Sequence, residues 1–232
     1  MPRKRVTPAL DRPLTPDQVI EAGLGLLDEV GITGFSTRAL AERLGTYPAT
    51  LYWHVGNRSR LLAAIVDRVL SELELLDPGS VSWQEWLRHG AREYRKVLHR
   101  HPNLGPVVAT QLTVSVPGIR LVETVLTVLE RAGFRGEALA DAYNTYVGSL
   151  LGWVSLELCA NPQDAEQDWY EEFAEAVRAL EPESYPVIAS DREHLADALF
   201  ALRWHGGADH PLDRSFEFAL EAWIEGLAAQ LG

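Results

Sequence analysis

The segment TYPATLYWHVGNR, from Thr46 to Arg58, carries side chains whose types and spacing suit contact with nucleic acid. If Leu51 points inward, a rotation of about 100° per residue points Ala49 and Trp53 outward. The outward face then combines a methyl group, hydroxyls and aromatic rings, without an acidic residue. Such a face can contact thymine methyls in a major groove and phosphates at its edges. The alternative is a small helical subdomain whose aromatic side chains belong to its core.

Three short helices are expected to position this segment. Thr15-Pro16-Asp17-Gln18 is a helix start with a cap, a proline at the first position and a side chain that reaches back. Gly31 can end that helix. A second helix is expected to begin at Ser36 and to be closed by Gly45. A third is expected to start at Thr46-Tyr47-Pro48 and to run to Val55, with Tyr47 and Pro48 on the inward side. Two short helices joined by a glycine turn predict a helix-turn-helix.

The same residues resemble a known family. TRALAERLG followed by PATLYWHVGNRSRLLAAI is similar to the N-terminal domain of the tetracycline-repressor (TetR) family. Weaker similarity in SWQEWLRHGAREYRKVL, LERAGF, GSLLGWVSLE and FEFALEAWIEGLAAQL extends to the regulatory domain of the tetracycline-repressor type. The resemblance implies an all-α fold and a repressor that binds a palindromic DNA operator as a homodimer. It also implies release of the DNA by a small-molecule effector.

The resemblance further implies residue roles at the DNA. Arg38 matches a base-reading arginine, and arginine prefers guanine. Pro48 and Ala49 lie where the repressor also reads bases, although Pro48 replaces its glutamine. Four residues match phosphate-contacting positions: Thr37, Thr50, Tyr52 and Arg58. His54 lies beside them, and Trp53 on the outward face completes the expected DNA contacts.

Charge is distributed unevenly along the 232 residues. The net charge is −12, yet residues 1–60 hold eight Lys and Arg against six Asp and Glu, which leaves 13 basic and 27 acidic residues in 61–232. An acidic body would be repelled by phosphates while a basic head approaches them. We therefore expect a basic arm (1–14), a DNA-binding domain (15–60) and a helical regulatory domain (61–232). The arm, with Arg3-Lys4-Arg5 and Arg12, is equally well explained as a solvated tail.

Helical periodicity continues through the regulatory domain. A fourth helix, capped by Asn57, is expected to run to about Leu76. The segment 104–116 fits a short helix better than a strand, because nothing nearby would pair with it. The other expected helices cover 82–100, 119–132, 136–159, 165–180, 191–204 and 213–231.

Two of these helices, 136–159 and 213–231, are expected to carry more apolar surface than a single subunit can bury. An apolar stripe at helical spacing is usually core. The resemblance instead implies dimerisation through the last regulatory helices, packed as a four-helix bundle. The residues expected at the dimer interface are Phe216, Leu220, Trp223, Ile224 and Leu227.

An effector pocket is implied inside the regulatory domain. Aromatic rings with a few polar groups make a pocket or a core, and the candidate lining is Trp86, His89, Tyr94, Thr110, Gln111, Tyr146, Trp153 and Glu157. Tetracycline with its magnesium ion is not the expected effector. Glu74 and Gly90 replace the repressor's histidine and asparagine, and Glu157 lies one residue out of step. We expect an aromatic or polycyclic effector, no metal and no cofactor.

Other function classes lack support. No HExxH, GxSxG, P-loop or dinucleotide-binding glycine motif is present, so an enzyme is not expected. The single Cys159 excludes an internal disulfide, and His99, His101, His205 and His210 fit helix ends better than a metal site. Without a transmembrane-length apolar run or signal peptide, no membrane association and a cytoplasmic location are expected. The remaining rival is a helical scaffold that binds only proteins.

Overall fold

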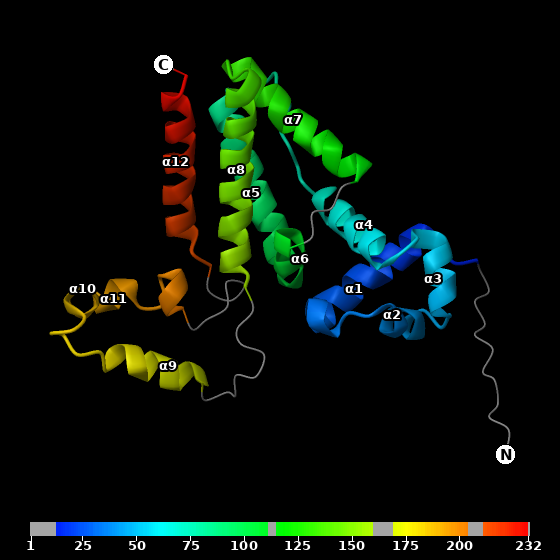
Figure 1. The fold of residues 1–232 in the computed structure, drawn as a ribbon, viewed down its shortest axis with the longest axis horizontal. Helices are drawn as coiled ribbons and strands as arrows, with labels where there is room; N and C mark the ends of the chain where they lie inside the picture. Colours follow the sequence, from blue (N-terminus) through cyan, green and yellow to red (C-terminus); the bar gives the residue numbers. More distant parts are fainter. Residues whose placement is uncertain (1–12, 111–114, 160–168, 204–210, 232) are drawn as a thin grey trace.

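The fold was analysed in a computed structural model that describes residues 13–110, 115–159, 169–203 and 211–231. Every regular element in these ranges is a helix, which confirms the all-α prediction. The helices form a small head, built from α1 to α3, and a larger body that ends in α12 (Figure 1). Helix α4 runs from the head into the body.

The head consists of α1 (Pro16–Gly34), α2 (Thr37–Arg43) and α3 (Pro48–Val55). Its first helix begins as predicted, because the Thr15 hydroxyl accepts from the Gln18 N–H and the Gln18 side chain accepts from the Thr15 N–H. Gly31 has a φ of 64° and interrupts the helical geometry where the sequence predicted an end. The three helices share one core of completely buried side chains, Val19, Leu27, Leu40 and Leu51.

Helix α4 (Arg58–Leu70) begins at the Asn57 cap but ends earlier than the predicted Leu76. The backbone leaves the helix at Ser71, and the Trp86 indole N–H donates to the Leu76 carbonyl at 2.8 Å. This contact comes from another helix, so the local helical pattern could not predict the end.

The body is built around α5 (Trp83–Arg100) and α8 (Gly136–Glu157). Helix α7 (Val116–Ala132) packs on both, and α12 (Asp213–Ala229) lies alongside α8 (Figure 1). Two ion pairs, Arg88–Glu221 and Arg92–Glu217, also hold α12 against α5. Between α5 and α7, η1 (Pro102–Leu104) and α6 (Gly105–Thr110) turn back toward the head, and α6 supports the helical interpretation of this segment.

The segment between α8 and α12 differs most from expectation. Helix α9 (Trp169–Arg178) falls inside the predicted range. In place of the predicted helix 191–204 the described residues form α11 (Arg192–Leu195) and η2 (Phe200–Leu202), and the unpredicted helix α10 (Pro186–Ser190) precedes them. Asp197 adopts a φ of 56°, which a continuous α-helix cannot contain. No side chain of these three short elements is buried, so no core contact stabilises one long helix.

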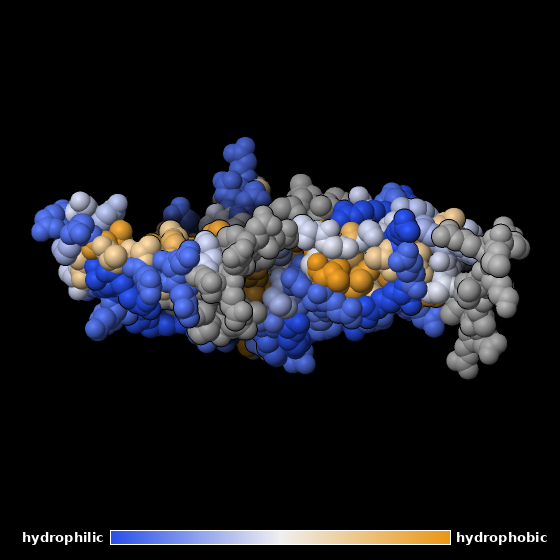
Figure 2. Space-filling model, turned by 90° about the horizontal axis from the view of Figure 1, so that it is seen from below, coloured by the Kyte–Doolittle hydropathy of each residue, from blue (hydrophilic) through white to orange (hydrophobic). Residues whose placement is uncertain are grey.

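One face of the molecule carries a hydrophobic area near the head. Figure 2 shows the molecule from below, where hydrophilic residues surround a compact hydrophobic area in the half that carries the head. Among the described helices, none combines the length and the apolar character needed to cross a membrane.

Candidate DNA interface and ligand cavity

A tight turn orients α3 against α2. Gly45 takes a φ of 60°, which a side chain would strain, and the Thr46 N–H donates to the Ala41 carbonyl at 2.9 Å. Leu40 and Leu51 are completely buried where the two helices meet. The buried pair fixes which face of α3 remains outside.

The outer face of α3 is aromatic and free. Trp53 is 82% exposed and its ring meets the His54 imidazole edge-on at 4.7 Å. Ala49 is also exposed, as predicted from helical rotation. Tyr47, predicted to point inward, is 62% exposed, because it is the extended N-cap residue and does not follow the helical rotation. Large exposed apolar rings on a capped helix indicate a contact surface.

A hydrogen bond between helices positions the hydroxyl groups of this face. The Thr37 and Tyr52 hydroxyls lie 3.1 Å apart, joining the start of α2 to α3. The Arg58 guanidinium lies 5.9 Å from the centre of the Phe35 ring, which places its charge beside the same face. Thr50 and Pro48 are half-buried at the edge of this group.

Arg38 is held only loosely. Its Nε lies 3.1 Å from Oε1 of Glu42, one turn further along α2, and the two side chains are 85% and 69% exposed. An exposed pair of this kind contributes at most about 1 kcal/mol. The guanidinium is therefore available to a base edge at small cost.

Polar contacts join the head to the body at η1. His101 Nδ1 lies 2.9 Å from the Asp28 carboxylate, and the Asn103 amide donates to the Asp28 carbonyl at 2.8 Å. Arg68 of α4 bonds both Glu21 of α1 and Glu72. A shift of η1 or α4 would consequently move α1.

The body contains a cavity of about 540 Å³ between α4, α5, α7 and α8. This volume lies in the range of small-molecule sites. Its wall is largely apolar, with aromatic rings from α5 and α8 facing aliphatic side chains of α4 and α7. The lining includes Val66, Leu70, Leu73, Leu75, Trp86, Gly90, Tyr94, Val108, Ser115, Ile119, Leu121, Val122, Val125, Tyr143, Asn144, Tyr146, Val147, Leu150 and Leu151.

Two buried tyrosines on the cavity wall differ in their bonding. The Tyr146 hydroxyl donates to the Leu87 carbonyl at 2.8 Å, whereas the Tyr94 hydroxyl has no hydrogen-bond partner in the described part of the chain. Tyr94 is only 7% exposed, and burial raises the pKa of both phenols. Both rings therefore remain neutral, and Tyr94 offers an unused donor.

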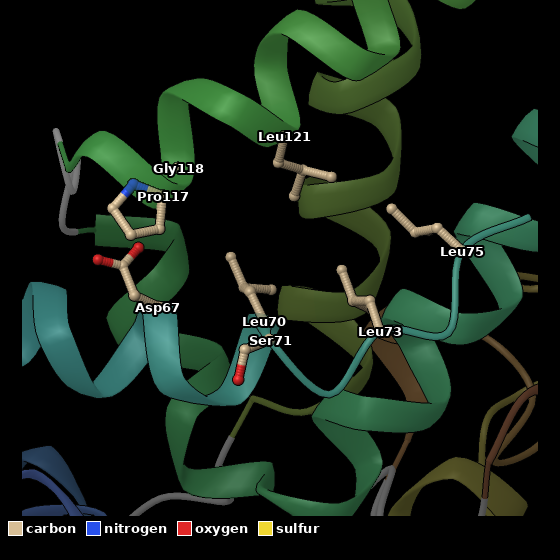
Figure 3. A pocket seen from close by; sticks show the side chains of 8 residues that line it. All are labelled: Asp67, Leu70, Ser71, Leu73, Leu75, Pro117, Gly118 and Leu121. Atoms are coloured by element: carbon tan, nitrogen blue, oxygen red, sulfur yellow. The ribbon is translucent and has the colours of Figure 1, made fainter. Parts of the chain in front are cut away.

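A smaller hollow of about 190 Å³ adjoins the cavity where the end of α4 meets the start of α7. The two share Leu70, Leu73, Leu75, Gly118 and Leu121, and the hollow adds Asp67, Ser71 and Pro117. In Figure 3 the Asp67 carboxylate points toward Pro117, while the leucines face one another across the opening.

The predicted pocket residues are only partly brought together. Trp86, Tyr94 and Tyr146 line the cavity. Gln111 lies outside the described residues, and the side-chain position of Thr110 is not described. The predictions for His89, Trp153 and Glu157 need correction, because all three lie outside the lining.

Each misplaced residue has a contact that explains its position. The His89 ring binds the Glu74 carbonyl at 2.6 Å on the outer side of α5. The Trp153 ring lies among Phe200, Phe216 and Trp223. These aromatic partners occupy the side of α8 that faces α12, away from the cavity.

Glu157 is an internal ion-pair partner instead of a ligand contact. Its side chain is fully buried and binds Arg95, His99 Nε2 at 3.2 Å and the Leu212 N–H at 2.7 Å. Burial alone would raise its pKa, but these hydrogen bonds and the Arg95 charge lower the pKa to about 2. The carboxylate remains ionised and ties α8 to α5 and to the start of α12.

The positions compared with the tetracycline repressor are also accounted for. Glu74 is exposed, and the Gly90 position faces Tyr146, whose hydroxyl would lie 3.4 Å from an added Cβ. Within the described ranges, no group of three His, Cys, Asp or Glu side chains could hold a metal ion.

The predicted dimer stripe turns inward. Phe216, Leu220, Ile224 and Leu227 are at most 4% exposed within one subunit, and Trp223 packs on Trp153. Phe216, Leu220, Ile224 and Leu227 therefore belong to the core that α12 shares with α5 and α8, whereas Trp223 is half-buried. Phe218 and Leu156, which the sequence analysis missed, are 80% and 53% exposed on the opposite faces.

Most of the cavity wall was also missed from the sequence. Its aliphatic members, such as Val122 and Val125 on α7, look like ordinary core residues in a helical pattern. Asn144 is a polar residue in a largely apolar helix and could have served as a signal.

Comparison with known proteins matches both halves of the chain. Residues 19–65 match the model for bacterial regulatory proteins of the tetR family, and residues 77–231 match the tetracyclin repressor-like C-terminal domain. An HTH-type transcriptional regulator of Saccharopolyspora erythraea is 33% identical over 77% of this chain and 75% of its own. The class A tetracycline repressor protein from transposon 1721 in Escherichia coli is 34% identical over 66% and 70%.

A solved structure has the same arrangement of helices. The Streptomyces coelicolor TetR family protein ActR, in complex with (S)-DNPA, superimposes with a TM-score of 0.73 at 27% identity, over 95% of this chain and 100% of that one. Its complex with actinorhodin gives a TM-score of 0.73 at 26% identity, over 95% and 98%.

Proposed function

The chain belongs to the TetR family of ligand-responsive, DNA-binding repressors, and we propose that it binds a palindromic operator as a homodimer until a small-molecule effector releases it. The proposal of DNA binding rests on the outer face of α3. Trp53 and Tyr52 are exposed there, and Arg38 is held by only one weak ion pair. A scaffold that binds only proteins would not need these groups arranged on a groove-sized helix.

The DNA contacts follow from this face. Trp53 and Ala49 meet bases in the major groove, Arg38 reads a guanine, and Tyr52 and Thr37 reach a phosphate together through their shared hydrogen bond. Thr50, His54, Pro48 and Arg58 complete the contact surface. Residues 1–14 would form an arm of the DNA-binding domain, which spans residues 15–60. Residues 61–232 would form the regulatory domain. The protein would act in the cytoplasm, where bacterial DNA lies.

The homodimer would form through the outer faces of α8 and α12. Added Cβ atoms at Gly148, Gly152 and Gly226 would meet no atom within 4 Å in the subunit, so these faces are open to close packing. Phe218 and Leu156 supply exposed apolar surface beside them. Four helices, two from each copy, would bury both faces. Two-fold symmetry would then place two α3 helices one DNA turn apart, or a multiple of it.

The effector would bind in the 540 Å³ cavity. Its aromatic and aliphatic lining suits an aromatic or polycyclic molecule. ActR, a structural neighbour, is solved with actinorhodin. Because α4 supplies part of the wall and also bonds α1 through Arg68, an occupied cavity would alter the position of the head.

The test is selection of sequences from a random duplex pool by the purified protein at about 150 mM salt, with Tyr52→Ala as the variant. Tyr185→Ala, which removes an exposed aromatic ring of the body, is the matched control. Enrichment of a palindrome by the wild type and the control, and loss of enrichment with Tyr52→Ala, is the expected result. A folded dimer that enriches no sequence would favour the protein-binding scaffold.

A further inference from the structure

The hollow beside the main cavity has a different chemistry from the cavity itself. The described lining of the cavity contains no Asp, Glu, Lys, Arg or His. The adjoining hollow contains one charged group, Asp67. A molecule that fills both spaces would meet a neutral, apolar wall at one end and a carboxylate at the other.

The Asp67 carboxylate is only partly engaged. The Ser115 hydroxyl donates to Oδ1 at 2.6 Å and itself accepts from the Gly118 N–H at 3.0 Å, as the cap of α7. Among the ion pairs of the described residues, none includes Asp67. The start of α7 offsets part of its charge, but Oδ2 has no described partner and the side chain faces the hollow (Figure 3).

A second polar group lies on the wall of the main cavity. Tyr94 is 93% buried, lines the main cavity and has a hydroxyl without a hydrogen-bond partner. A buried hydroxyl that lacks a partner is costly, so a ligand that accepts its hydrogen bond gains affinity. The combined space is therefore largely apolar, with an unpartnered hydroxyl on the wall of the cavity and a carboxylate at the hollow.

We infer that the effector is an amphiphilic cation, with a neutral aromatic body in the main cavity and a protonated amine against Asp67. The inference rests on the proposed function, since it names the chemistry of the effector that the function requires. The ammonium group would compete with Ser115 for the carboxylate. Because Asp67 belongs to α4 and Ser115 to the start of α7, that exchange would act on the helix that carries the head.

The test compares two probes that share one aromatic body and differ at the terminal amine, which is charged in one and acetylated and neutral in the other. The first is 1-[(2-aminoethyl)amino]anthraquinone, which has a planar body with carbonyl acceptors and a cationic amine; the second is its neutral N-acetyl derivative. Binding to the full-length protein is measured by calorimetry without DNA. We expect the amine to bind about tenfold more tightly than the amide, a typical gain for a partly exposed charge pair.

Variants connect that preference to Asp67. Asp67→Asn should remove the tenfold preference and leave the affinity of the amide unchanged. Glu123→Gln, which alters an exposed carboxylate on α7 outside the lining, should retain the preference. Ser115→Ala removes the hydrogen bond to the Asp67 carboxylate and should keep or increase the preference for the amine. This variant therefore tests the site even if Asp67→Asn folds poorly. Tyr94→Phe should weaken both probes alike, by about threefold or more.

Several results would overturn the inference. Equal binding of the two probes, failure of both to bind, or an amine preference that survives in Asp67→Asn would each mean that Asp67 serves only the start of α7. The proposed function is tested by a separate experiment. It is contradicted if the same protein selects no DNA sequence, independently of the result of the probe-binding experiment.

Discussion

Arg95 of α5 and Glu157 at the end of α8 form a two-pronged ion pair, with Nε and Nη2 of the arginine 2.8 and 2.7 Å from the two carboxylate oxygens. The Glu157 side chain is fully buried, and Asp213 binds Arg95 from the start of α12. Three helices that are distant in sequence therefore meet at one charged group. Removal of Glu157 would leave Arg95, whose side chain is 13% exposed, with a single carboxylate partner, Asp213, in the described part of the chain.

Glu157→Ala is accordingly expected to lower the free energy of unfolding by about 3–5 kcal/mol. Urea denaturation followed by circular dichroism measures the change. Glu130→Ala, which removes one side of an exposed pair with Arg135, is the control and should cost less than about 1 kcal/mol. A loss as small as that of the control would show that Arg95 finds another partner or water.

The same group predicts acid sensitivity. The pKa of Glu157 falls from 4.5 to about 2 on folding. A lowered pKa contributes stability that is fully present above 4.5 and is lost as the pH falls from 4.5 toward 2. Denaturation midpoints measured between pH 6 and pH 2.5 should therefore fall more steeply for the wild type than for Glu157→Gln. Parallel curves would assign the acid sensitivity to other carboxylates.

Arg38→Ala should relax base preference at one position of each half-site. A bidentate arginine–guanine contact discriminates by about 1–3 kcal/mol, and the weak Glu42 pair costs little to break. Affinities for the selected operator and for variants at each position measure the effect. If the mutant binds every variant as the wild type does, the base-reading role of Arg38 is wrong.

Arg58→Ala should weaken binding to all sequences alike, because a phosphate contact carries no sequence information. The slope of log affinity against log salt should decrease by about one for each subunit that loses a contact. Arg135→Ala, an exposed arginine at the start of α8, provides the control and should leave the slope unchanged. A change in base preference without a change in slope would contradict the phosphate role.

Gly152→Leu should separate folding from assembly. A Cβ at Gly152 meets nothing within 4 Å in the subunit, and leucine favours a helix more than glycine does. The variant should remain helical but sediment as a monomer and lose operator binding. Gly23→Leu is the contrast, since its Cβ would lie 2.9 Å from the Ile65 side chain and folding itself should suffer. A dimeric Gly152→Leu protein would move the interface elsewhere.

Val122→Trp should fill part of the cavity from α7. Effector affinity should fall by at least tenfold while operator affinity remains near that of the wild type, because α3 is unaltered. Calorimetry with the aminoethyl anthraquinone and a DNA-binding assay measure the two separately. Unchanged probe binding would place the effector outside this cavity.

The sequence by itself determined the helices of the DNA-binding head and the start of α4. Caps such as Thr15 and Asn57 act within a few residues, and Gly45 marks its turn locally, so these features could be read from neighbouring positions. Helical rotation about Leu51 was sufficient to place Ala49 and Trp53 outside.

Only the tertiary structure decided which apolar face meets which neighbour. The pattern of α12 is the same whether Phe216 and Leu220 pack inside a subunit or between two, and only the fold shows that both side chains are buried within the subunit. The end of α4, the cavity wall and the position of Glu157 likewise depend on contacts between residues that are ten or more positions apart. Periodicity reports that a side chain is buried, whereas its partner depends on how the helices cross.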